Sequence, residues 1–262
     1  MFSMFVPFLA GAAIGILGGL IGLGGAEFRL PLLIGLFGFA ALPAVILNKA
    51  VSLIVVASAL LFRMKSVPLE TVAAHWQIIL NLLAGSLIGA WLGADWATRM
   101  RGDALHRVLA VLLVLIAGTL LFGHDPSAGP PLVAGTAQMA VGVFAGFAIG
   151  VIASLMGVAG GELLIPTLML VFGANIKLAG SLSLAISLPT MLVGFARYSR
   201  DQSFSVLKGN KSFVLIMAAG SIVGSFFGGL LLGVVSPEIL LPLLATVLII
   251  SAVKVWRHRL TE

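Results

Sequence analysis

Two glutamates stand at matching places in a stretch that the chain carries twice. Residues 22–33 read GLGGAEFRLPLL and residues 157–168 read GVAGGELLIPTL, so Glu27 and Glu162 are 135 positions apart. An ionisable residue inside a membrane-embedded segment is costly and is a functional candidate by default. Desolvation favours the protonated form of a carboxyl group, so these two side chains are predicted to carry protons. Helix capping is the alternative, because a helix N-terminus also favours a carboxylate.

The glycines just before each glutamate could hold an anion. Glycine allows close backbone approach, and free N–H groups at a helix N-terminus bind anions without a full charge. The substrate-binding candidates at the two breaks are Gly24, Gly25, Ala26, Gly160 and Gly161, with Arg29 following in the first copy only. A tight turn alone would also explain the glycines, and Arg29 could simply pair with Glu27.

Further polar candidates follow inside apolar sequence. The first half offers Asn48, Lys49 and Ser52, and the second half offers Ser181, Ser183 and Ser187. Lys49 could attract the anion, or its long side chain could extend to the membrane interface or pair with a carboxylate. The serines could contact the substrate, although serines in membrane helices also bond to their own backbone. The counterpart of Lys49 in the second copy is Leu184, so the halves are expected to contribute unequally.

Other polar positions have structural explanations. Asp95 is expected to pair with Arg99 one turn later, and Gln138 to bond to a neighbouring helix. His75 and Trp76 are expected to begin a spanning segment at the membrane interface.

The elements that must position these residues are membrane helices. Of the 262 residues, 60% are hydrophobic and 9% are charged, whereas a soluble domain has roughly 25% charged residues. Eight long apolar runs, each near the roughly 20 residues that cross a bilayer as a helix, cover 2–23, 43–62, 72–94, 104–122, 132–156, 178–196, 212–235 and 239–256. The sequence therefore predicts an all-α polytopic membrane protein, with the first run as a spanning helix and not a removed signal peptide.

The chain is also predicted to be a tandem duplication. The same shift of 135 positions places GSLIGAWLG at 85–93 on GSIVGSFFG at 220–228. Glycines four residues apart in both segments favour close helix approach. The predicted units are residues 1–125 as the first membrane repeat, 126–131 as a central linker and 132–262 as the second membrane repeat.

Two short segments, near 28–39 and 163–174, follow the glycine breaks, and each contains a proline. Each spans about 18 Å as a helix, too little to cross alone, and paired broken segments point to a transporter's binding site. If they cross, each repeat has five segments and the repeats are inverted. If they re-enter, each has four and the repeats run parallel. Eight to ten segments in total are expected, and we favour the inverted arrangement.

The net charge of +6 comes from short basic clusters between apolar runs, which is typical of cytoplasmic loops and not of a nucleic-acid site. The 197–211 loop and the C-terminal tail fall on one side in either arrangement, which predicts a cytoplasmic C-terminus. The clusters at 63–65 and 99–107 change sides between the two arrangements. The chain has no cysteine and no H-E-x-x-H, G-x-S-x-G or nucleotide-binding loop, so no enzyme activity, metal site or cofactor is expected.

The doubled stretch, in a two-repeat chain of this size, resembles the sulfite exporter TauE/SafE family over essentially the whole length. The family's hallmark is a glycine-rich run followed a few residues later by proline, and both copies have it, with Pro31 and Pro166. The resemblance implies a multi-pass permease of the bacterial inner membrane for small sulfur-containing anions, such as sulfite and organosulfonates.

These observations together predict a secondary transporter of a small anion, sulfite or an organosulfonate. Coupling to protons through Glu27 and Glu162 and alternating access between the two repeats are expected. Its partners would be the anion, protons and the lipid bilayer, with no nucleic acid. A channel, or a cation or metal transporter that uses the two glutamates as ligands, is the alternative left open.

Overall fold

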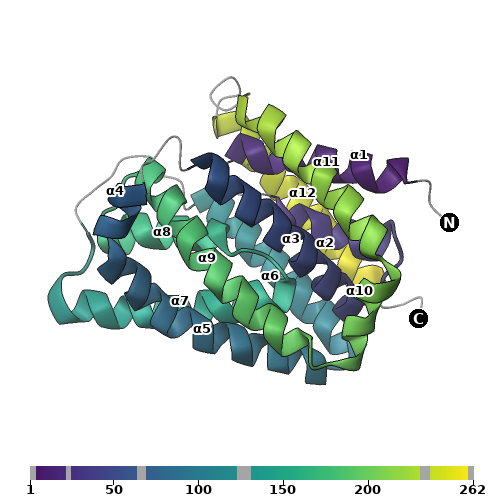
Figure 1. Cartoon of the computed structure of the whole chain (residues 1–262), viewed down its shortest axis with the longest axis horizontal. Coiled ribbons are helices and arrows are strands. Elements are labelled where there is room, and N and C mark those ends of the chain that lie inside the picture. The colour runs from purple at the N-terminus through teal and green to yellow at the C-terminus, as the bar shows by residue number, and fades with distance from the viewer. Residues whose placement is uncertain (1–3, 22–24, 64–68, 123–130, 231–236, 259–262) are drawn as a thin grey trace.

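The computed structural model describes residues 4–21, 25–63, 69–122, 131–230 and 237–258, and these segments are mostly helical (Figure 1). The helices of the first half are α1 (Phe5–Ile21), α2 (Ala26–Gly35), α3 (Ala41–Arg63), α4 (Leu69–Ala74), α5 (Trp76–Arg99) and α6 (Gly102–Phe122). Those of the second half are α7 (Gly135–Met156), α8 (Gly161–Phe172), α9 (Ile176–Tyr198), η1 (Gln202–Ser205), α10 (Val206–Gly209), α11 (Lys211–Leu230) and α12 (Pro237–His258). No strand occurs among the described residues, so the all-α prediction is confirmed.

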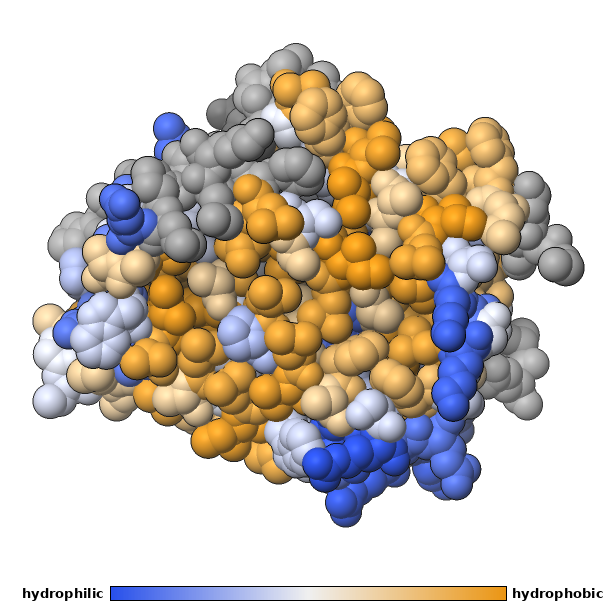
Figure 2. Space-filling view, in the orientation of Figure 1, coloured by the Kyte–Doolittle hydropathy of each residue, from blue (hydrophilic) through white to orange (hydrophobic). Residues whose placement is uncertain are grey.

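Within the described ranges, seven helices are long and apolar enough to cross a membrane, namely α3, α5, α6, α7, α9, α11 and α12. Helices α1 and α8 are apolar but shorter, and α2 has only 10 residues. Figure 2 shows apolar side chains over most of one face, with hydrophilic ones gathered toward the end where α10 lies. The prediction of a multi-pass membrane protein is confirmed.

Each short helix begins directly after a glycine in the left-handed backbone region. Gly25 (φ 69°) precedes α2 and Gly160 (φ 79°) precedes α8, and residues with a Cβ rarely adopt such angles. A Cβ at Gly25 would also lie 2.6 Å from the carbonyl oxygen of Ile14, in the middle of α1. The glycine thus lets α2 begin beside α1 and not beyond its end.

Helix α8 returns along α7 to the end at which α7 began. The Leu132 N–H, just before α7, donates to the Leu170 carbonyl near the end of α8 at 2.9 Å. Gln138 Nε2, in the first turns of α7, donates to the Val171 carbonyl at 2.7 Å. The prediction that Gln138 bonds to a neighbouring helix is confirmed, and α7 with α8 forms a helical hairpin.

Two pairs of long helices approach at their backbones: α5 packs on α7, and α1 packs on α11. Along α5 the successive glycines Gly85, Gly89 and Gly93 lie against the carbonyl groups of Val143, Phe147 and Val151, in that order. A Cβ at Gly93 would lie 2.6 Å from the carbonyl oxygen opposite. The order of these contacts means that α5 and α7 run in the same direction, at the close range that the glycine spacing predicts.

Helices α3 and α9 lie side by side and run in opposite directions (Figure 1). Lys49, in the first half of α3, lies against Gly194 near the end of α9. Val56, further along α3, packs with Met191, which is earlier in α9. The polar candidates of α3 therefore face the middle of the molecule, where both halves of the chain contribute.

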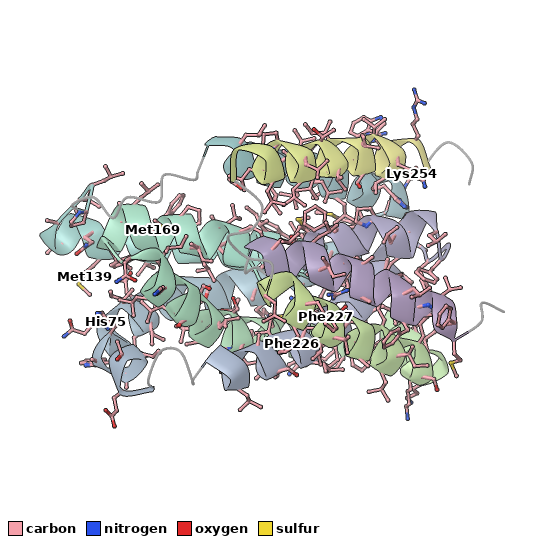
Figure 3. All side chains as sticks on the ribbon, turned by 90° about the horizontal axis from the view of Figure 1, so that it is seen from above. His75, Met139, Met169, Phe226, Phe227 and Lys254 are labelled. Carbon is pink, nitrogen blue, oxygen red and sulfur yellow. The ribbon has the colours of Figure 1, made fainter. Side chains whose placement is uncertain are left out.

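The two ends of the long axis carry different groups. Figure 3 shows His75 and Met139 at one end and Lys254 at the other. His75 directly precedes α5, which begins at Trp76 as expected. A Cβ at Gly35 would lie 3.2 Å from Lys254 Cε, so α2 ends near the end of α12.

Candidate functional site

The Glu27 and Glu162 side chains meet inside the protein, although they belong to different halves of the chain. Each is the second residue of its short helix, and they are 0% and 3% exposed. The two carboxyl groups are near enough to repel one another as anions. None of their four oxygens has a partner in hydrogen-bond geometry among the described residues. Two buried carboxyl groups, one from each half of the chain, therefore lie near one another where α2 and α8 begin.

Arg29 is completely buried two residues after Glu27 in α2. Its Nη1 donates to Ser52 Oγ at 3.0 Å and to Asn48 Oδ1 at 3.3 Å, with a longer contact to the Asn48 carbonyl at 3.5 Å. No ion pair joins Arg29 to Glu27 among the described residues, whose ion pairs involve Asp95. The local pairing suggested for Arg29 and Glu27 is thus not formed, because residues two apart on a helix point in different directions.

Asn48 ties three segments together beneath the carboxyl pair. Its Nδ2 donates to the Ala26 carbonyl at 3.0 Å and to the Met156 carbonyl at 3.1 Å. Ala26 begins α2 and Met156 ends α7, so one side chain of α3 bridges the glycine breaks of both halves. Asn48 is 0% exposed. Its two bonds hold the side chain in the position where its Oδ1 accepts the hydrogen bond from Arg29.

Lys49 points away from Arg29, into the contact between α3, α7 and α9. Its Nζ donates to Ser154 Oγ at 3.1 Å and lies 5.8 Å from the centre of the Tyr198 ring. Tyr198 in turn donates its hydroxyl to the Ser154 carbonyl at 2.8 Å. Lys49 is 1% exposed, so the alternative that it reaches the membrane interface is wrong. Packing by α9 and α7 holds the side chain inside.

The candidate serines of α9 bond to backbone carbonyl groups. Ser181 donates to Lys177 and Ser183 to Gly180, both within α9. Ser187 instead reaches out of its helix and donates to Ala159, in the second glycine break, at 2.7 Å. The structure therefore brings Ser187, Gly160 and Gly161 close to the glutamate pair, whereas Ser181 and Ser183 are satisfied locally. Gly24 lies outside the described residues.

Sequence reasoning did not identify Ser154 and Tyr198 as neighbours of the site. Ser154 stands three residues before the second glycine break, and Tyr198 is the single tyrosine of the chain. Both are fully buried, which only the packing of α7 against α9 reveals. Arg197, next to this tyrosine, was also missed as the partner of Asp95, because the two are 102 positions apart.

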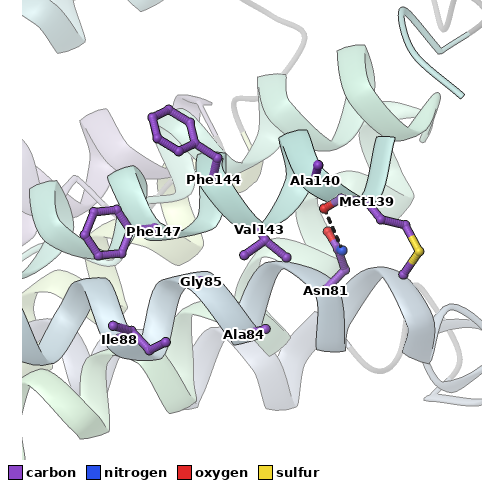
Figure 4. Close-up of a pocket in the computed structure, with 9 residues that line it drawn as sticks. All are labelled: Asn81, Ala84, Gly85, Ile88, Met139, Ala140, Val143, Phe144 and Phe147. Atoms are coloured by element: carbon purple, nitrogen blue, oxygen red, sulfur yellow. Dashed lines mark hydrogen bonds between the residues drawn. The ribbon is translucent and has the colours of Figure 1, made fainter. Parts of the chain in front are cut away.

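A groove of about 580 Å³ lies elsewhere, between α5 and α7 (Figure 4). Its lining is apolar apart from Asn81, whose Nδ2 donates to the Met139 carbonyl at 3.0 Å. Phe144 on its rim is 74% exposed. None of the charged candidates lines this groove. No group of three or more His, Asp or Glu side chains suited to a metal ion occurs among the described residues.

Comparison with known proteins supports the resemblance of the doubled motif. The sequence matches the family model described as sulfite exporter TauE/SafE over residues 5–260. No curated protein and no solved structure matches the chain. The match covers both glycine breaks and every described helix. Seven of these helices have the length and composition of membrane spans. The chain therefore belongs to the sulfite exporter TauE/SafE family, a family of membrane transporters and not of enzymes.

Proposed function

We propose that this protein moves a small anion, sulfite or an organosulfonate, in exchange with or together with protons that bind to Glu27 and Glu162. The observation that carries the proposal is the buried, neighbouring carboxyl pair without hydrogen-bond partners among the described residues. Two like charges at this separation favour states with at least one proton bound. A site that changes its proton content when its surroundings change is what proton coupling needs.

The positive groups around the pair suit an anion. Arg29 and Lys49 are buried cations, and the first N–H groups of α2 and α8 point toward the same region because the glutamates begin both helices. Protonation of the carboxyl pair would remove negative charge that competes with the anion for these donors. Proton binding and anion binding would then favour one another.

Alternating access would come from inverted repeats that rock about this site. A shift of 135 positions places the bounds of α2, α3 and α5 within a few residues of α8, α9 and α11. Since α3 and α9 run in opposite directions beside one another, a half-turn about an axis in the membrane plane would relate them. The hairpin of α7 and α8 returns the chain to the end at which α7 began, which supports an odd number of segments in the second repeat.

The positions of the basic residues support one orientation in the membrane. The ends of α5 and α9, with Arg99, Arg197 and Arg200, lie at one end of the molecule, as the contact of Arg197 with Asp95 requires. Basic residues mark the cytoplasmic side. We place this end, together with both termini, in the cytoplasm of a bacterial cell, with the protein in its inner membrane.

The decisive experiment is sulfite flux in liposomes containing the purified full-length protein, with and without an imposed pH gradient. Flux in the wild type should follow the gradient, and the Glu27→Gln/Glu162→Gln variant should lose that dependence. Glu70→Gln, an exposed change in α4, is the matched control and should behave as the wild type. Gradient-driven flux that persists in the double variant would reduce the glutamates to helix caps.

A cation transporter that uses the two carboxylates as ligands is the second candidate. The four unpartnered oxygens favour it, because carboxylate oxygens are the usual ligands of hard cations. The buried Arg29 and Lys49 oppose it by repelling a cation. Current measurements on the same liposomes separate the two, since sulfite and a metal cation carry charge of opposite sign.

A further inference from the structure

We infer that the anion binds to the Nε–Nη2 edge of Arg29, so that the protein has a single, two-oxygen clamp located in the first half of the chain. This inference rests on the proposed function and names the group that recognises the substrate. The basis of the inference is that only one of the three guanidinium nitrogens of Arg29 donates hydrogen bonds to described residues.

The guanidinium is held by one nitrogen only. All the hydrogen bonds that Arg29 makes among the described residues come from Nη1, to Ser52 and Asn48. Asn48 is itself fixed by two carbonyl groups. The plane of the guanidinium is therefore set from one side by α3, and the opposite edge keeps a defined direction.

The opposite edge of the guanidinium is buried, and its donors are unpaired within the described residues. Nε and Nη2 are both inaccessible and have no hydrogen-bond partner within the described part of the chain. Burying the donors of a cation without acceptors is unfavourable, so the arrangement is suited to a state in which acceptors arrive. These two nitrogens present parallel N–H groups whose spacing matches two oxygens on one atom. Sulfite and the sulfonate head group both offer that geometry, whereas a halide offers one acceptor atom.

The second half of the chain has no equivalent clamp. The shift of 135 positions places Leu164 on Arg29 and Ser187 on Ser52. Leu164 is 1% exposed in an apolar cluster, and Ser187 bonds to Ala159. One anion per chain is therefore expected, displaced from the glutamate pair toward α3.

The test compares Arg29→Lys with the wild type, using purified full-length protein and sulfite titrations followed by calorimetry. Lysine keeps the charge but loses the fork, so sulfite affinity should fall about tenfold or more, as expected for losing a bidentate charged contact. Competition by chloride should change far less, so the preference for sulfite over chloride should fall. Arg101→Lys, in the exposed loop before α6, should leave both values unchanged.

Ser52→Ala provides a second variant in case Arg29→Lys folds poorly. It keeps Arg29 and removes one of the bonds that orient it, so a loss of sulfite affinity of a few fold is expected. If both variants still transport sulfite and bind it with the affinity and selectivity of the wild type, the clamp is overturned. The proposed function would then still stand. Absence of sulfite and sulfoacetate transport in the wild type would instead reject the proposed function and the clamp with it.

Discussion

The Arg197 guanidinium of α9 bonds to the Asp95 carboxylate of α5, with 2.9 Å between Nε and Oδ1. Arg99 holds the other oxygen of that carboxylate at 2.8 Å, so the predicted pair of Asp95 with Arg99 is confirmed as one arm of a three-residue cluster. The contact with Arg197 places the last turns of α5 and α9 at the same end of the molecule. In the parallel arrangement of repeats those two ends would lie on opposite sides of the membrane. The contact therefore favours inverted repeats.

Single cysteines test this orientation directly, because the chain has no cysteine of its own. Asp103→Cys and Ser205→Cys should react with a membrane-impermeant maleimide from the same, cytoplasmic side, and Thr71→Cys from the other side. Thr71 and Ser205 lie outside the long apolar spans, and Asp103 is the second residue of the span Gly102–Thr119. All three positions are exposed. Labelling of positions 71 and 205 from one side, with 103 from the other, would establish the parallel arrangement instead.

The ion pair of Asp95 and Arg197 should contribute measurably to stability. The Arg197 and Asp95 side chains are 16% and 18% exposed, so the pair is less screened than a fully exposed one, and Arg197→Gln should lower the stability of the protein. Thermal unfolding in detergent would show this as a loss of a few degrees. Arg99→Gln is the control, since the Arg99 side chain is 74% exposed, and should change little. If Arg197→Gln lowered the unfolding temperature as much in an Asp95→Asn background as in the wild type, the coupling would be absent.

The glycines of α5 should tolerate no side chain. Gly93→Ala would place a Cβ against the Val151 carbonyl of α7, and forcing the helices apart should cost about 1–3 kcal/mol. Gly118→Ala in α6 is the matched control, because nothing lies within 4 Å of a Cβ there, and it should be neutral or slightly stabilising. Unfolding midpoints in one detergent compare the two. Equal midpoints would mean that the close approach of α5 to α7 does not limit this position.

Replacing one of the two neighbouring glutamates should make the protein more stable. Glu27→Gln or Glu162→Gln removes a like-charge contact and should raise the free energy of unfolding by about 1 kcal/mol, while the second replacement adds little. Helix capping predicts the opposite sign, a loss of about 0.3–1 kcal/mol for each lost carboxylate. Denaturation of the two single variants and the double variant at neutral pH therefore separates the pair from the caps.

The asymmetry between the halves should appear in transport. Lys49→Met removes a buried cation near the site and should slow sulfite flux at least about threefold, while leaving the protein as stable or more stable. Leu184→Met changes the matching position of the second half and should leave flux unchanged. Equal effects of the two substitutions on sulfite flux would mean that the halves contribute alike.

Most of the helices could be read from the sequence, because each is a local property of the chain. Apolar runs of bilayer length predicted α3, α5 and α9, and the glycines with left-handed angles, Gly25 and Gly160, marked where the short helices begin. The two glutamates stood out for the same local reason, since a carboxyl in apolar sequence is costly wherever it is buried. The family followed from the glycine-rich run and proline of each copy.

Which of these residues meet was decided by tertiary packing. The meeting of Glu27 with Glu162, the bridge from Asn48 to both glycine breaks, and the burial of Lys49 against Tyr198 all join segments from opposite halves of the chain. Sequence spacing fixes neighbours only within a helix, because residues three and four apart share a face. The direction in which α3 passes α9 depends on how the helices pack. This packing brings the two similar stretches of sequence together.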